Sequence, residues 1–294
     1  MALSPWRERR RAWFRLLRRL ARNPLSLAGV IGIVAFVLIG LTASYWVPYP
    51  EHILTAPSIR DRLQSPGAEH WFGTDDMGRD IFSRVMVGTG LSLRVGVVVV
   101  LLASSVGSLL GLVAGYVGGW VDMVLMRVTD GFLAFPALVL ALAVAVSLGP
   151  SLLHGLLAIT VVWWPWYARL VRSVTLQLRH ELFVEAARAT GGGTLHILWR
   201  HVFPNCLAPI LVQASMDFGY VVLTAASLSF IGVAAQPPQP EWGLMVNTGR
   251  RFFPDWWWMA TFPGLAIFLA VFAFNVFGDG LREVLDPRMN QNQS

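Results

Sequence analysis

The sequence contains no lysine and only one cysteine, Cys206, in 294 residues. One cysteine excludes an internal disulfide, so we expect Cys206 to serve in packing alone. Charge is also scarce, because charged residues make up 14% of the chain and apolar residues 55%. Soluble domains carry roughly a quarter charged residues. The shortage of charge therefore excludes an ordinary soluble domain and predicts a polytopic membrane protein.

Motifs for covalent chemistry are missing as well. The sequence has no phosphate-binding GxxxxGK(S/T) loop, no zinc-type HExxH pair and no convincing pair of catalytic carboxylates. Phosphate cradles and zinc sites need such residues at such spacings. We therefore expect no catalytic residue, no metal site and no cofactor in this chain, and it is not predicted to be an enzyme.

Long uncharged stretches dominate what is present. They approach or exceed the roughly 20 residues that a membrane helix needs, and Gly149 with Pro150 divides the longest of them. The sequence predicts an all-α fold with six transmembrane helices, near residues 25–47, 91–117, 124–148, 151–171, 207–233 and 257–280.

The arginines indicate the orientation of these helices. All 23 basic residues are arginine, and eight of them precede the first predicted span. Basic residues stay in the cytoplasm, so both termini are predicted there if six spans follow. The uncharged run that follows these eight arginines is too long for the core of a signal peptide. Residues 1–24 also carry tryptophan and leucine, which favours membrane lipid over nucleic acid as their partner.

A polar segment lies between the fourth and fifth predicted spans. Good helix formers over residues 181–190 predict a short helix, and Gly191 to Gly193 predict a bend. Thr194 is expected to cap a second short helix toward Arg200, closed by Pro204. Small residues leave a narrow surface that can enter a groove on another protein. We expect a docking loop, whose candidate residues are Glu185, Ala186, Ala187, Gly191, His201 and Pro204; the alternative is an ordinary solvated loop.

Four glycines recur every fourth residue in the second predicted span: Gly107, Gly111, Gly115 and Gly119. Such spacing lays a ridge of glycine along one face of a helix, where another membrane helix can approach closely. The sequence therefore predicts tight helix packing at these four positions.

Several side chains are candidates for a translocation pathway. Asp217 lies inside the fifth predicted span, where an ionisable group is either functional or hydrogen-bonded to another helix. Trp163, Trp164 and Trp166 flank Pro165 in the fourth span and either line the pathway or only pack. Arg127 and Asp130, three residues apart, are expected to form a local ion pair.

A second polar motif lies between the first and second predicted spans. Thr74 or Asp75 is expected to cap an amphipathic helix that carries Met77 and Ile81 and lies along the outer membrane surface. Asp80 is expected to pair with Arg84 at helical spacing, and the spacing fits no standard metal site. The residues of this motif are Gly73, Thr74, Asp75, Gly78, Arg79, Asp80, Ser83 and Arg84.

These motifs resemble those of ABC importer permeases. The docking loop matches the EAA, three residues, Gly pattern of that family, and the outer motif is typical of the C-type permeases of its dipeptide, oligopeptide and nickel branch. The proline-rich stretch 236–243 and the stretch 274–287 are similar to further signatures of the branch. His201 departs from the wider family, in which many members have an aliphatic residue there.

The resemblance implies a bacterial cytoplasmic-membrane complex. Its expected partners are a homologous B-type permease, two ATPases that bind ATP and Mg²⁺, and an extracytoplasmic solute-binding protein. The expected solute is a short peptide, with nickel, a metal chelate or glutathione as alternatives; a secondary transporter is the alternative outside the family. The expected organisation is a basic segment at 1–24, a first span with its outer loop at 25–90, a core at 91–281 with the coupling loop at 172–206, and a tail at 282–294.

Overall fold

The computed structural model describes residues 23–55 and 59–285. The expectations for the basic segment 1–22 and for the tail beyond residue 285 lie outside these ranges. The predicted all-α fold is confirmed. The longer helices are α2 (Pro24–Trp46), α3 (Ile81–Val117), α4 (Gly119–Leu133), α5 (Ala137–Leu148), α6 (Leu152–Leu178), α7 (Leu182–Ala189), α9 (Phe203–Ile231), α10 (Trp242–Gly249) and α11 (Trp258–Leu285). Shorter turns are η1 (Pro50–Ile53), η2 (Ile59–Asp61), α8 (Thr194–Ile197), η3 (Leu198–Val202) and η4 (Arg250–Phe252).

The long helices confirm a multi-pass membrane protein. Four helical stretches are long and apolar enough to cross a membrane, namely α2, α3, the run Thr194–Ile231 and α11. A fifth follows if α4 and α5, which meet at 90°, form one bent span. Helix α6 has 27 residues but is less apolar, because three tryptophans, Tyr167 and two arginines lie within it. Six spans are thus consistent with the fold, although α6 does not qualify by apolarity alone.

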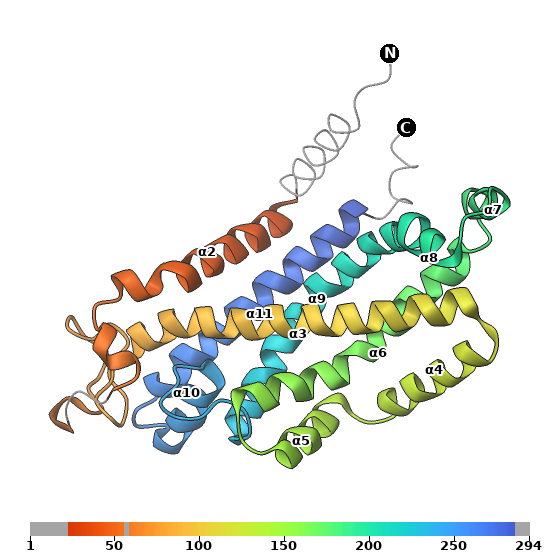
Figure 1. Cartoon of the computed structure of the whole chain (residues 1–294). Coiled ribbons are helices and arrows are strands. Elements are labelled where there is room, and N and C mark those ends of the chain that lie inside the picture. Colours follow the sequence, from red (N-terminus) through yellow and green to blue (C-terminus); the bar gives the residue numbers. More distant parts are fainter. Residues whose placement is uncertain (1–22, 56–58, 286–294) are drawn as a thin grey trace.

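Helix α3 runs through the middle of the molecule (Figure 1), with α2 on one side of it and α4 and α5 on the other, while α11 crosses it in this view. It packs most extensively on α6 and also contacts α2 and α9. A Cβ added to Gly107 would lie 2.3 Å from the carbonyl oxygen of Trp164, and one added to Gly111 would lie 2.5 Å from that of Ala168. One added to Gly115 would lie 2.7 Å from Cβ of Thr175 and 2.9 Å from the carbonyl oxygen of Arg172. These three glycines therefore let the backbones of α3 and α6 touch.

Gly119 does not belong to this face, contrary to the prediction. Helix α3 ends at Val117, and Gly118 and Gly119 follow with φ of 72° and 57°. Such left-handed backbone turns the chain sharply, and glycine adopts it at little cost. No atom lies within 4 Å of a Cβ added to Gly119, which instead opens α4.

The predicted third span is broken. Helix α4 ends at Leu133, and Pro136 precedes α5. Proline disfavours helical backbone in the residue before it and lacks an amide hydrogen, so Pro136 favours a break between α4 and α5. The predicted pairing of Arg127 with Asp130 is also wrong, because Asp130 accepts a hydrogen bond from Arg169 of α6 at 2.6 Å.

The predicted surface helix of the outer motif is wrong as well. Thr74 and Asp80 form an isolated β-bridge around a turn, and α3 begins only at Ile81. Asp80 is its N-cap, accepting a hydrogen bond from the amide of Ser83 at 2.7 Å. Ile81 and Val85 are buried. The apolar face therefore enters the protein core, so this stretch is the first part of a long spanning helix.

Candidate functional site

The docking loop contains the short helix predicted from its composition. Helix α7 begins three residues after the end of α6 and exposes most of its side chains, since only Val184 is buried. Gly191, with φ of 85°, ends the helix, and the amide of Gly192 bonds the carbonyl of Ala187 at 2.9 Å. The sequence therefore forms a helix anchored by one side chain and a glycine bend.

Two details of this loop differ from prediction. Gly193, not Thr194, is the N-cap of α8, and it makes no side-chain capping bond. Pro204 does not close a helix, because α8 continues through η3 into α9 and Pro204 lies in the first turn of α9. Proline fits there because the first amides of a helix have no partner inside it.

An open groove of about 650 Å³ runs along this loop. Among the sequence-predicted residues, Ala186, Ala187, Gly191 and His201 line it, whereas Glu185 and Pro204 do not. The other lining residues are Phe183, Thr190, Gly192, Gly193 and His196. The lining combines small side chains with two imidazoles, and the open groove can receive a helix or loop of another protein.

Tyr116 is a residue of this region that no sequence pattern singles out. Arg188 of α7 lies over its ring, 5.9 Å from the centroid, and donates a hydrogen bond to its hydroxyl at 3.5 Å. Tyr116 lies near the end of α3, so this contact connects α7 to the central helix. Glycine spacing predicted the face of α3 but carried no signal for this side chain.

The second polar motif is buried. We use the name polar cap for residues 49–55 and 59–84. Asp75 accepts hydrogen bonds from the amide and Nε of Arg79, at 2.9 and 2.7 Å. Arg84 is 3% exposed and donates to the carbonyl oxygens of Ile53 and, at 3.2 Å, Pro238. The guanidinium therefore joins the polar cap to the proline-rich loop.

Asp80 does not pair with Arg84, contrary to the prediction. Its carboxylate bonds Nδ1 of His70 at 2.8 Å, and its amide donates to Nδ1 of His52 at 3.2 Å. Burial lowers the pKa of His52, and the charges of Glu51 and Asp80 oppose this shift. Burial also raises the pKa of Asp76 in the same cap. The two histidines were not expected from any spacing in the sequence.

The remaining motif residues hold the turns of the polar cap. Thr74 accepts a hydrogen bond from the amide of Gln64 at 2.8 Å, and Trp258 of α11 donates to the carbonyl of Thr74 at 3.2 Å. Gly73 and Gly78 have φ of 73° and 79°. Ser83 accepts from the amide of Tyr49 at 3.3 Å.

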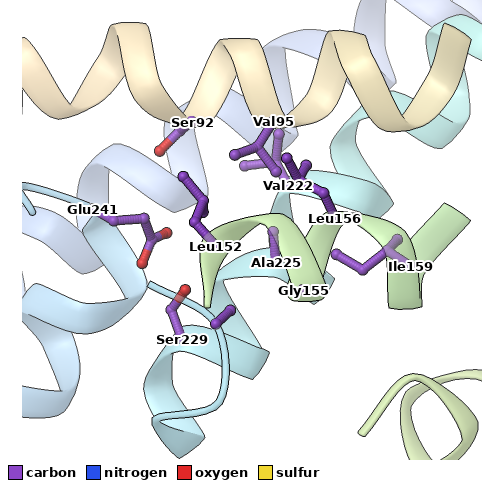
Figure 2. A pocket seen from close by; sticks show the side chains of 11 residues that line it. Ser92, Val95, Leu152, Gly155, Leu156, Ile159, Val222, Ala225, Ser229 and Glu241 are labelled. Carbon is purple, nitrogen blue, oxygen red and sulfur yellow. The ribbon is translucent and has the colours of Figure 1, made fainter. Parts of the chain in front are cut away.

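A small cavity lies between α3, α6, α9 and the start of α10 (Figure 2). Ser92, Ser229 and Glu241 surround one end of it, and apolar side chains such as Val222 line the other. Its volume of about 10 Å³ holds roughly one water molecule. Glu241 is 3% exposed and caps α10 by accepting from the amide of Leu244 at 2.8 Å. Burial raises the pKa of Glu241, and the backbone amides of Leu244 and Gly243 oppose this shift.

The candidate pathway residues do not form one wall. Trp163 is buried, Trp164 packs edge-on against Phe132 at 5.4 Å, and Trp166 is 49% exposed. Asp217 is 6% exposed, and one carboxylate oxygen accepts from Nε2 of Gln213 at 3.0 Å. Within residues 23–55 and 59–285, no group of three histidine, cysteine or acidic residues is arranged to hold a metal ion.

Comparison with known proteins identifies the family. Residues 107–291 match the model described as binding-protein-dependent transport system inner membrane component, and residues 4–66 match the N-terminal TM domain of oligopeptide transport permease C. A dipeptide transport system permease of Alkalihalophilus pseudofirmus is 47% identical over 98% of this chain and 91% of its own.

Two further relatives match over nearly the whole length. A probable D,D-dipeptide transport system permease of Escherichia coli is 43% identical, covering 100% of this chain and 97% of the relative. A glutathione transport system permease of Pectobacterium atrosepticum is 42% identical, covering 97% and 92%. The chain therefore belongs to the binding-protein-dependent transport system inner membrane components, the permeases of ABC importers.

Proposed function

We propose that this chain is one of two permease subunits of an ATP-driven importer that moves short peptides across the bacterial cytoplasmic membrane. The observation that carries the proposal is the exposed helix α7 with its open groove, which sits between two long helices and engages little of this chain's own surface. The relatives named for dipeptide, D,D-dipeptide and glutathione transport support a peptide as the solute. Glutathione, itself a small peptide, is the first alternative, and nickel or a metal chelate comes after it.

In this proposal, the docking loop receives a partner ATPase. The groove is lined by Ala186, Ala187, Gly191 and His201, and Glu185 supplies an exposed charge on α7. Pro204 starts the helix that leaves the loop. Two such ATPases bind ATP and Mg²⁺, since this chain has no phosphate-binding loop. Their closure would displace α7 and, with it, the helices on both sides.

A B-type permease completes the pathway in this proposal. Two cavities within the described residues have volumes of about 10 and 40 Å³, which is far below the few hundred cubic ångströms of a small-molecule site. A path between two permease subunits accommodates a peptide without requiring space inside either one. A solute-binding protein would deliver the peptide at the end that carries the polar cap.

The proposed orientation places both termini and α7 in the cytoplasm. The side chain of Asn23 donates to Glu283 at 3.2 Å, so the first and last described residues lie at the same end of the molecule. Figure 1 shows α7 at that end, opposite the polar cap. Eight arginines precede α2, and basic segments favour the cytoplasmic side.

The experiment measures uptake of a labelled dipeptide, glutathione and nickel by cells that lack this gene. The gene is restored as wild type, Glu185→Arg or Gly191→Pro; proline cannot adopt the positive φ of Gly191. An Asp255→Arg variant is the control, because Asp255 is an exposed carboxylate just before α11 and lies outside the groove. We expect dipeptide uptake to return with wild type and the control. With the loop variants we expect it to fall about tenfold or more, which is typical of a disrupted interface hot spot.

Two results would count against different parts of the proposal. Dipeptide uptake could be unchanged in the deletion strain while glutathione or nickel uptake is lost. This result would reject the peptide as the solute, but the chain would still be an importer subunit. Normal uptake and normal stimulated ATPase activity in well-assembled complexes of both loop variants would reject the docking role of α7.

A further inference from the structure

A buried polar cluster joins α6 to α9. Asp217 of α9 is 6% exposed, and Tyr167 of α6 is fully buried. The Tyr167 hydroxyl and the Trp163 indole lie beside the Asp217 carboxylate. Ionisable and hydroxyl groups are rare among packed membrane helices, because each one left without a partner is costly there. The presence of three polar side chains at this buried position therefore calls for an explanation.

The hydrogen bonds of the cluster are incomplete within α9. Oδ1 of Asp217 accepts from Gln213, one turn away in the same helix. Oδ2 of Asp217 and the hydroxyl of Tyr167 are both buried and have no hydrogen-bond partner. A phenol hydroxyl donates and a carboxylate oxygen accepts, so the two free groups are complementary across the contact between α6 and α9.

Tyr167 is held from behind by the central helix. A Cβ added to Gly107 would lie 2.6 Å from Cβ of Tyr167, so α3 leaves no room for the tyrosine to move back. Its side chain is fully buried. The cluster thus lies where α3, α6 and α9 are in contact with one another.

The two helices that the cluster joins, α6 and α9, flank the docking loop in the sequence. Helix α6 enters the docking loop and α9 leaves it, with α7 and α8 between them. A displacement of α7 can therefore move α6 and α9 together or can spread them apart. Only the first response transmits the displacement to the rest of the permease.

We propose that Asp217 is a positioning residue that fastens α9 to α6 through Tyr167 and Trp163, so that both helices move as one body when α7 is displaced. The inference rests on the proposed function, since it assumes an ATPase that moves α7. Asp217 does not line the cavity of Figure 2 and is nearly buried, which favours this role over contact with the solute.

The test measures the distance between α6 and α9 by electron paramagnetic resonance in the assembled transporter. Spin labels are attached at Ser173 and Leu211, which are exposed on these two helices, after Cys206→Ser removes the native thiol. We expect the same distance without nucleotide and with ATP in wild type. In Asp217→Leu we expect a broader distribution that shifts with ATP, and about threefold less solute transported per ATP hydrolysed, as for the loss of one polar contact between membrane helices.

Three variants separate this role from a general loss of stability. Asp217→Asn keeps a side chain that accepts and donates, so we expect it to restore the wild-type distance and coupling. Tyr167→Phe removes one hydroxyl and should broaden the distances even if Asp217→Leu fails to assemble. Thr224→Val is the control, because the Thr224 hydroxyl bonds the carbonyl of Tyr220 in its own helix at 2.8 Å and should have no effect.

A distance between α6 and α9 that changes with ATP in wild type would overturn the proposal. Wild-type distances and coupling in Tyr167→Phe would overturn it too, as would Asp217→Asn behaving like Asp217→Leu. Failure of the proposed function is a separate result, because it would appear as absence of ATP-dependent peptide uptake by wild type itself.

Discussion

The polar cap and the docking loop are both polar motifs between apolar helices, yet the fold treats them in opposite ways. In the cap, Asp75, Asp80 and Arg84 are buried, and all three bond other parts of this chain. In the loop, α7 exposes nearly every side chain and borders an open groove. A motif whose polar groups are satisfied internally serves the structure, whereas one left exposed is free to meet a partner.

One helix connects the two regions. Helix α3 begins at the N-cap Asp80, packs its glycines on α6 and ends close to Tyr116, which contacts Arg188 of α7. The rigid cap and the exposed loop are therefore joined through a closely packed pair of helices. Each prediction below removes one part of this arrangement.

The largest effect is expected from Arg84→Met. The change removes a buried guanidinium and leaves the carbonyl oxygens of Ile53 and Pro238 without this donor, whereas Asp75 keeps its bonds to Arg79. Each buried polar group left without a partner costs about 1–3 kcal/mol of stability. Thermal unfolding of the purified complex should show the loss. Arg94→Met is the matched control on α3, since Arg94 is exposed and bonds only the carbonyl of Gly90 in its own helix. Equal melting temperatures for the two variants would contradict the structural role of the cap.

A smaller loss of stability is expected from Gly111→Leu. Even its Cβ would lie 2.5 Å from the carbonyl of Ala168, so α3 and α6 must separate. Overpacking of this kind costs about 1–3 kcal/mol. Gly131→Leu introduces the same side chain on α4, where nothing lies within 4 Å. Thermal unfolding should separate the two variants, and a melting temperature for Gly111→Leu that matches Gly131→Leu would refute close packing at this face.

Ala186→Trp should affect transport without affecting stability. The indole would fill the groove that Ala186 lines, while the side chain stays exposed. We expect ATP-dependent uptake to fall about tenfold, as for a blocked interface hot spot, with an unchanged melting temperature of the permease. Ala189→Trp makes the same change on an exposed position of α7 outside the groove lining. Equal losses in both variants would show that α7, and not its groove, carries the contact.

The smallest effect is expected from pH at the polar cap. Burial lowers the pKa of His52 in the folded state, whereas the pKa of an unfolded histidine is about 6.5. The folded protein therefore favours the neutral form of His52. The contribution of His52 to the free energy of unfolding is complete above about pH 6.5 and is lost as the pH falls below that value. Protonation also removes the acceptor at Nδ1 that bonds the Asp80 amide.

The measurement is the melting temperature of the complex at about pH 7.5 and about pH 5.5, on either side of the pKa of a free imidazole. We expect a decrease of a few degrees on acidification in wild type and a smaller decrease in His52→Gln, whose amide oxygen can still accept. The groups facing His52 are Tyr49, Glu51, Asp61, His70 and Asp80. The raised pKa of Asp76 favours the folded state as the pH falls, which is opposite to the effect of His52. Asp76 is present in both wild type and His52→Gln, so its effect cancels in the comparison. Identical pH responses would exclude His52 as the group responsible.

Much of the fold was predictable because a membrane helix requires a continuous run of apolar residues, which is visible in the local sequence. The uncharged runs predicted α2 and α11 closely, and the glycine triplet predicted the bend after α7. Helix boundaries were less predictable: α3 extends ten residues further toward the N-terminus than expected, and Pro136 divides the third span. A hydropathy run reports where apolar residues begin, but a helix can continue into polar sequence when tertiary contacts satisfy it.

The candidate sites divide in the same way. Glu185, Ala186, Ala187 and Gly191 stand out from sequence because their spacing is a local property of one short helix. The partners of Asp80, Asp130 and Arg84 do not, because a residue three or four positions away was the nearest candidate and proved to be wrong.

The sequence by itself determined that this protein is an all-helical membrane permease with a short helix and a glycine bend between two long helices, because apolarity and motif spacing act over a few neighbouring residues. Only the tertiary structure decided which polar groups meet. Arg84 and Pro238, like Tyr167 and Asp217, lie far apart in the chain, and they come together through helix packing and rotation. A buried charge in a membrane protein takes whatever partner the packing brings to it, and no local rule names that partner.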